Sequence, residues 1–231
     1  MSRERGYFTK WSSATAAVFL KDLRSELRTR YALNALIMFV VTTISIILFA
    51  LGNETTSSEI LAGVLWIIVF FSTMSGLSRT FVSEEERGTV MTLQLVSAPS
   101  SVFFGKLLFN TVLLLAMNTF TVLLYVLLLS GFSIRSYDIF IAATFLGTLG
   151  LASASTIIAA IIAKANTKGT LYPVLSFPIL LPLLLTVINA TRLSVDGAVF
   201  SEAWGEFRIL LSYVVVVTTA SYVLFDFVWK D

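Results

Sequence analysis

Six long segments without a single charged side chain constrain what this chain can fold into. Each residue of a helix adds about 1.5 Å, so roughly 20 apolar residues cross the hydrocarbon core of a bilayer, which is about 30 Å thick. The segments are close to that length, and we predict that each is a transmembrane span. They cover residues 32–51, 60–77, 107–129, 139–163, 171–188 and 209–224.

All six spans are expected to be helical. The bilayer core has no water, so every backbone N–H and C=O group needs a partner inside the protein, which a helix supplies within one segment. Alternating segments of about ten residues, typical of a transmembrane barrel, are not found in the sequence. Charged residues make up only 13% of the chain, whereas about a quarter of a soluble domain is charged. We therefore predict an all-α integral membrane protein.

The basic residues predict how the chain lies in the membrane. Residues 1–31 carry seven of the 16 Lys and Arg residues and no apolar stretch like that of a signal peptide, so we expect the N-terminus in the cytoplasm. In that orientation 13 of the 16 basic residues lie on the cytoplasmic side, as the positive-inside rule requires. Six spans then place the C-terminus in the cytoplasm as well.

Residues 14–31 predict an amphipathic helix ahead of the first span. Its apolar side holds Leu20, Leu23, Leu27 and Tyr31, and its basic side holds Lys21, Arg24 and Arg28. Such a helix lies in the headgroup plane of a membrane. The alternative is a solvated leader that only enforces topology. We therefore divide the chain into a cytoplasmic basic segment with an interfacial helix, residues 1–31, and a six-span membrane domain, residues 32–231.

The loop between the second and third spans contains the most informative motif. Ser83 is followed three residues later by Glu86, as in a capping box, and the acids 84–86 suit the positive end of a helix dipole. The result is an acidic knuckle on the predicted cytoplasmic side. It is either a docking surface for a cytoplasmic partner or a solvated turn with a few acids.

A second short helix is predicted directly after this acidic turn. Gly88 and Thr89 offer a bend and a new helix cap, and Pro99 is expected to end the helix that follows. Residues 90–96 are mainly apolar but too few to cross a bilayer. This helix is therefore expected at the membrane surface.

Small residues form a ridge along the fourth span. They recur at i+4 spacing, interrupted only by Leu151, and small residues let helices approach closely in lipid. We favour packing inside the chain for this ridge over a role in a dimer or a substrate path. The ridge residues are Ala143, Gly147, Ser155, Ala159 and Ala163.

The fifth span contains three of the four prolines of the chain, Pro173, Pro178 and Pro182. Each removes a backbone hydrogen bond and kinks a helix. The span is thus a candidate gating helix, or else a permanently kinked packing helix. Asn189, Arg192 and Trp204, in the following segment 189–208, are expected in an external loop, with a short re-entrant or interfacial helix within it as a further option.

No catalytic or metal site is predicted in this chain. It has no Cys and no His, which excludes a zinc finger, a thiol nucleophile, an imidazole base and the usual haem ligands. Gly105-Lys106 is the nearest fragment of a phosphate-binding loop, but a Walker A motif would need Gly in place of Ser100. The spans also lack the ionisable groups that ion-coupled carriers use. We expect neither enzymatic activity nor nucleic-acid binding.

The loop between spans two and three resembles the coupling segment of type-2 ABC transporter permeases. The pattern is acid–x–acid–x–Gly–Thr, then a Leu, a Pro and a Lys, at Glu84, Glu86, Gly88, Thr89, Leu93, Pro99 and Lys106. Two further stretches, Leu-Gly-Thr-Leu-Gly at 146–150 and Phe-Pro-Ile-Leu-Leu-Pro-Leu-Leu-Leu at 177–185, resemble the CcmB family. CcmB, or haem exporter protein B, is the permease subunit of the cytochrome c maturation system. The resemblance covers nearly the whole chain from about Val18 onward.

This resemblance implies an ABC-2-type permease fold in the inner (plasma) membrane of a bacterium. It implies a separate CcmA-type ATPase that uses ATP and Mg²⁺, the partners CcmC, CcmD and CcmE, a second copy of the chain, and haem as a possible cargo. No cofactor is expected on this chain itself. The residues assigned to the coupling segment are Glu84, Glu85, Glu86, Arg87, Gly88, Thr89, Leu93 and Pro99.

Several functions remain open at the level of the sequence. The permease could move haem, or it could drive release of the haem-loaded chaperone CcmE from CcmC, and the absence of His favours the second. An ABC-2 exporter of another substrate is a further possibility. So is a membrane scaffold that recruits partners and transports nothing.

Overall fold

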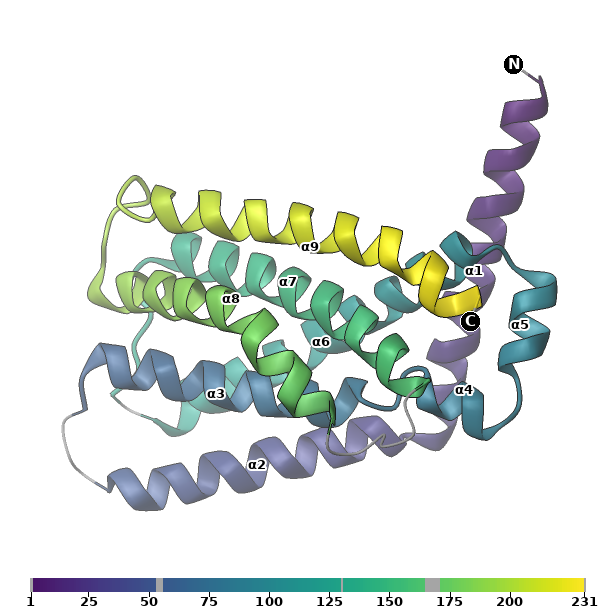
Figure 1. The fold of residues 1–231 in the computed structure, drawn as a ribbon. Helices are drawn as coiled ribbons and strands as arrows, with labels where there is room; N and C mark the ends of the chain where they lie inside the picture. The colour runs from purple at the N-terminus through teal and green to yellow at the C-terminus, as the bar shows by residue number, and fades with distance from the viewer. Residues whose placement is uncertain (1, 53–55, 130, 165–170, 231) are drawn as a thin grey trace.

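The computed structural model describes residues 2–52, 56–129, 131–164 and 171–230, and the regular structure in these residues is entirely helical. Figure 1 shows long helices that run beside one another in a bundle, with the first helix crossing one end. The elements are α1 (Ser2–Thr29), α2 (Tyr31–Leu51), α3 (Ser58–Leu77), α4 (Val82–Glu86), α5 (Val90–Val96), α6 (Pro99–Leu128), α7 (Tyr137–Ala163), α8 (Leu171–Asp196) and α9 (Trp204–Lys230).

Six helices in the described part of the chain, α2, α3 and α6 to α9, are long and apolar enough to cross a membrane. This confirms the prediction of an all-α membrane protein with six spans. Three of them are clearly longer than predicted, because α6 begins at Pro99 instead of 107, α8 ends at Asp196 instead of 188, and α9 covers Trp204–Lys230 instead of 209–224. Polar residues therefore continue the helices beyond their charge-free parts.

The expected external loop 189–208 is correspondingly wrong. Asn189 and Arg192 lie in the last turns of α8, and Trp204 is the first residue of α9. The amide of Asn189 donates a hydrogen bond to Glu206 Oε1 at 2.6 Å, so this polar side chain is paired inside the helical bundle. The loop is thereby reduced to the residues between α8 and α9. Lys168, in the loop between α7 and α8, lies outside the described residues.

The helix α7 forms the centre of the bundle. All residues from 150 to 160 are buried, and α7 packs against α6, α8 and α9. A Cβ atom at Gly147 would lie 2.6 Å from Trp66 Cη2 and 2.9 Å from Val187 Cγ2, so α3 and α8 approach α7 as closely as glycine allows. The ridge is buried within this one chain at each position, namely Ala143, Gly147, Ser155, Ala159 and Ala163.

Side-chain hydrogen bonds join the spans inside the bundle. Asn110 and Asn118 of α6 donate from Nδ2 to the hydroxyls of Thr156 and Thr148 of α7, each at 2.8 Å. The two helices are antiparallel, so these bonds form two rungs of one ladder. In lipid such bonds replace the water that a soluble protein would offer.

The helix α8 has two prolines in its interior, Pro178 and Pro182. Pro173 is the third residue of the helix, where N–H groups have no intrahelical acceptor in any case. Only two of the three prolines therefore remove a bond within the helix. Figure 1 shows α8 bending along its length, as prolines in a helix interior require.

One end of the bundle gathers α1, α4, α5 and the C-terminus, as Figure 1 shows. The loops between α2 and α3, between α6 and α7, and between α8 and α9 lie at the other end. We call the end that gathers α1, α4, α5 and the C-terminus the α1 end. An even number of spans requires the chain to begin and finish on the same side, whereas the cytoplasmic location of this side stays a prediction.

Candidate functional site

The helix α1 packs on the start of α6 through a face that the apolar stripe did not predict. Thr15 and Val18 are buried, and a Cβ atom at Gly105 would lie only 2.7 Å from Val18 Cβ. Leu20 and Leu27, two members of the predicted stripe, are exposed. The exposed stripe thus remains suited to a membrane surface, while a separate face joins α1 to the bundle.

The first helix ends earlier than the predicted boundary at residue 31. Arg30 adopts a left-handed backbone conformation with φ 51°, and α2 begins at the next residue. The two helices therefore meet without a loop. Glu26 Oε1 accepts a hydrogen bond from the backbone N–H of Leu33 at 2.9 Å, which satisfies one of the free donors in the first turn of α2.

The predicted capping box at Ser83 is wrong. The helix α4 begins at Val82 and Phe81 occupies its N-cap position, so Ser83 lies inside the helix and no side chain caps it. Glu86 instead pairs with Arg79, whose Nη2 atom lies 2.8 Å from Glu86 Oε2. Because Phe81 occupies the cap position, Ser83 lies two residues too late in the chain for its hydroxyl to cap α4.

The turn after α4 contains the predicted bend and the predicted cap residue. Gly88 adopts φ 66°, which only glycine accepts at no steric cost, and this turns the chain into α5. Thr89 occupies the N-cap position of α5, but its hydroxyl donates to the carboxylate of Glu84 and its side chain caps no N–H group of α5. Pro99, expected to end α5, is the first residue of α6, and α5 already ends at Val96.

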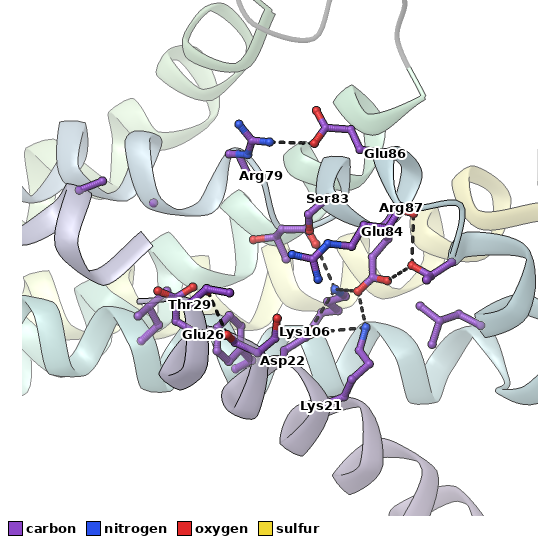
Figure 2. Close-up of a pocket in the computed structure, with 18 of the residues that line it drawn as sticks. Lys21, Asp22, Glu26, Thr29, Arg79, Ser83, Glu84, Glu86, Arg87 and Lys106 are labelled. Atoms are coloured by element: carbon purple, nitrogen blue, oxygen red, sulfur yellow. Dashed lines mark hydrogen bonds and ion pairs between the residues drawn. The ribbon is translucent and has the colours of Figure 1, made fainter. Parts of the chain in front are cut away.

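Four charged side chains from three helices meet at the α1 end, and we call them the ion cluster: Lys21, Asp22, Glu84 and Lys106. Lys106 Nζ lies 2.8 Å from Glu84 Oε1 and 3.0 Å from Asp22 Oδ2. Lys21 Nζ donates to the same oxygen of Glu84 and lies 3.1 Å from Asp22 Oδ1. Figure 2 shows the two amino groups converging on the Glu84 carboxylate from α1 and α6.

Two members of the ion cluster, Lys106 and Glu84, are buried, and a third, Lys21, is partly exposed. The Lys106 side chain is 2% exposed and that of Glu84 is 8% exposed, whereas Lys21 is 42% exposed. Lys106 also donates to the backbone oxygen of Thr80 at 3.0 Å and lies 5.3 Å from the centre of the Phe81 ring. The amino group of the buried lysine thus has three oxygen atoms as partners, as burial of a charge requires.

The charges hold each other in their ionised forms. Burial alone would raise the pKa of the Glu84 carboxyl, but the positive charge and hydrogen bond of Lys106, with hydrogen bonds from Lys21 and Thr89, lower that pKa to about 2. Burial would likewise lower the pKa of Lys21, and Asp22 and Glu84 raise it above its ordinary value. Glu84 lies in α4 and Lys21 in α1, both outside the charge-free stretches of the spans. Glu84 and Lys21 are therefore both charged at neutral pH.

A cavity of about 770 Å³ opens beside the ion cluster, between α1 and α3 on one side and the α4–α5 segment on the other. Figure 2 shows Arg79, Glu86 and Arg87 around it. Its walls carry four bases, Lys21, Arg79, Arg87 and Lys106, and four acids, Asp22, Glu26, Glu84 and Glu86. Because these charges balance, the walls do not select a ligand of either sign.

The helix α5 projects large apolar side chains away from the bundle. Met91, Leu95 and Val96 are 72%, 83% and 77% exposed, although α5 lies outside the six spans. Gln94 holds this helix in place by donating from Nε2 to the backbone oxygen of Trp229, in the last turn of α9. Trp229 in turn stacks on Phe225 with ring centres 5.4 Å apart.

The structure divides the predicted coupling residues into two groups. Glu85, Glu86, Arg87 and Gly88 are exposed, and Thr89, Leu93 and Pro99 are partly buried. Glu84 is buried in the ion cluster, so its side chain is not on the exposed surface of the segment, and its part in coupling stays a prediction. The physical reason is that Lys21 and Lys106 compensate its charge inside the protein.

The sequence did not reveal the partners of Glu84. Lys21 was assigned to the basic side of an interfacial helix and Lys106 to the pattern of the coupling segment, and Asp22 had no assigned role. One signal was available, because Asp22 is an acid within an otherwise basic stretch of the N-terminal helix. An acid in that setting points to a partner in another segment.

A protein-family model matches most of the chain. The family model described as CcmB protein matches residues 13–227, a range that begins near the middle of α1 and ends in the last turns of α9. Both the ion cluster and the α4–α5 segment lie within the matched residues. A comparison with curated proteins found no match.

Proposed function

The chain belongs to the CcmB family and is a membrane component of the cytochrome c maturation haem exporter system, and from this we propose that it is the permease subunit that receives the motion of a separate ATPase. The α4–α5 segment would be the receiving element. The fold would then be that of an ABC-2-type permease, with the α1 end in the cytoplasm.

The exposed apolar side of α5 carries this proposal. Met91, Leu95 and Val96 lie outside the spans, at the end that holds α1 and the C-terminus. Large apolar side chains gathered on a surface outside lipid mark a site for another protein. The exposed charges of Glu85, Glu86 and Arg87 border this side and would orient the partner.

The partner that fits is an ATPase of the CcmA type, which would supply ATP hydrolysis with Mg²⁺. Such machines hydrolyse ATP between two ATPase copies, so two copies of the present chain would assemble. CcmC, CcmD and CcmE would be the further partners. The site of action would be the bacterial inner membrane.

We propose that the complex acts on haem without the side chains of this chain binding the haem iron. The sequence offers no His or Cys to ligate iron. ATP-driven release of haem-loaded CcmE from CcmC therefore fits the chain better than passage of haem along its own side chains. Haem remains the cargo of the complex in either case.

The test is a charge placed on the apolar side of α5. Leu95→Asp should lower the amount of ATPase that co-purifies with the complex at least tenfold, because the carboxylate would be buried in the interface. Val199→Asp is the matched control, since Val199 is similarly exposed but lies at the opposite end of the bundle. Unchanged recovery of the ATPase with Leu95→Asp would refute the proposal.

A further inference from the structure

The helix α1 is fixed to the start of α6 along several turns. Trp11 donates from Nε1 to Ser100 Oγ at 3.1 Å, and its ring lies edge-on to Phe104 with centres 5.7 Å apart. A Cβ atom at Gly105 would lie 2.9 Å from the backbone oxygen of Thr15. The helix α1 therefore cannot slide along α6 unless the two helices first separate.

The ion cluster ties the same helix to α4. Asp22 of α1 pairs with Lys106, and Lys21 of α1 pairs with Glu84. Displacing α4 alone would leave buried charges without partners, which is far more costly than moving the helices together. The helices α1 and α4 and the start of α6 therefore behave as one body.

The far end of α1 controls the position of α2. Arg30 is the only residue between the two helices, and Glu26 Oε1 binds the N–H of Leu33 at 2.9 Å. The helix α2 buries the stripe Leu36, Val40 and Ile44 and packs Ile37 and Ile47 partly against the bundle, whereas Met38, Ile46 and Phe49 on its other side are exposed. A span held on one side shifts more easily than α7, which is buried along most of its length.

We propose that α1 transmits displacement of the α4–α5 segment to α2, with Lys21, Asp22 and Lys106 as the positioning residues. This inference rests on the proposed function, since the displacement would originate in the ATPase docked on α5. It assigns the N-terminal helix a mechanical role besides that of a membrane-surface helix. Movement would reach the first span from the second-to-third loop without passing along α3.

The first experiment separates transmission from docking. In the full complex, Asp22→Asn should keep ATPase recovery and ATP hydrolysis within twofold of wild type, while haem attachment to a c-type cytochrome per ATP hydrolysed falls at least tenfold. Asp22→Glu should restore most of this ratio, because it returns the charge. Arg24→Gln, an exposed neighbour on another side of α1, is the control and should leave the ratio unchanged. An Asp22→Asn complex with a ratio within twofold of wild type overturns the inference.

A second experiment does not depend on removing a charge. The sequence has no Cys, so a pair introduced by Trp11→Cys and Ser100→Cys can be joined selectively with a short bifunctional maleimide. If α1 and the start of α6 move as one body, the joined complex should retain the haem-attachment rate of the unjoined pair within twofold. A tenfold loss on joining would mean that the two helices must separate, and would overturn the inference.

The outcomes distinguish this inference from the proposed function. If Leu95→Asp keeps its ATPase, the docking proposal fails whatever Asp22→Asn does. If Leu95→Asp loses its ATPase and Asp22→Asn still couples normally, docking stands and transmission through α1 is wrong.

Discussion

Lys106 Nζ lies 2.8 Å from Glu84 Oε1, and the two side chains are 2% and 8% exposed. This pair joins the third span to the short helix that follows the second span. It also determines how the remaining charges at the α1 end are arranged, because Asp22 approaches the same amino group.

Removal of Lys106 should destabilise the protein strongly. Lys106→Met would leave Asp22 and Glu84 to share Lys21, which is partly solvated, and breaking a buried ion pair costs about 3–5 kcal/mol. We expect a loss of about 3 kcal/mol in the free energy of unfolding, measured by chemical denaturation in detergent micelles. Lys10→Met, at an exposed position of α1, should cost less than about 0.5 kcal/mol. Equal losses in both variants would contradict the role of the pair.

Stability should fall in acid because of Glu84. The pKa of its carboxyl is about 2 in the folded protein, below its ordinary value of 4.5, so the unfolded chain binds a proton more readily between these two values. The contribution of Glu84 is therefore present above about pH 4.5 and is lost as the pH falls toward 2. Melting temperatures at pH 6 and pH 3 should show a smaller difference in Glu84→Gln than in wild type. Glu85→Gln, at an exposed position of the same helix, should keep the wild-type difference.

Contact between α3, α7 and α8 should make Gly147 sensitive to a single methyl group. In Gly147→Ala the new Cβ would lie 2.6 Å from Trp66 Cη2, so the helices would have to move apart at a cost of about 1–3 kcal/mol. Gly63→Ala is the matched change in α3, where nothing lies within 4 Å of the added atom, and it should be neutral or stabilising by up to about 1 kcal/mol. Unfolding in micelles compares the two, and equal effects would show that the close approach is unimportant.

The prolines of α8 should matter according to their place in the helix. If α8 gates, Pro178→Ala and Pro182→Ala should each reduce haem attachment to a c-type cytochrome at least tenfold while the complex still hydrolyses ATP. Pro173→Ala should have little effect, because the first turn lacks intrahelical N–H partners. Normal haem attachment in both interior variants would instead favour a passive scaffold.

The spans were predictable because the information that defines them is local. Six charge-free stretches of sufficient length each specify a helix in lipid, whatever the rest of the chain does. Their boundaries were less predictable. Asn189 and Lys106 continue helices α8 and α6, and only the paired partners Glu206 and Glu84, which are distant in sequence, make those positions favourable.

The candidate site was predictable in composition but not in arrangement. The acidic turn, the short apolar helix and Lys106 were recognisable from residue order. Which of three consecutive acids would be buried depends on where Lys21 and Lys106 lie in space, and no pattern within the loop contains that information. The apolar stripe of α1 did not predict its packing face for a related reason. Leu20 and Leu27 are exposed and suit lipid, whereas Val18 packs against Gly105 of α6.

The single-residue junction at Arg30 makes the length of the chain between Asp22 and Leu36 a fixed quantity. One residue added or removed there would rotate α1 by about 100° about its axis, because a helix has 3.6 residues per turn. Asp22 would then face away from Lys106, while Leu36 would still pack against Gly76. The loops at the opposite end of the bundle could accommodate an insertion, whereas the junction at Arg30 could not. Sequences with this architecture should therefore vary in residue type at the junction but keep its length.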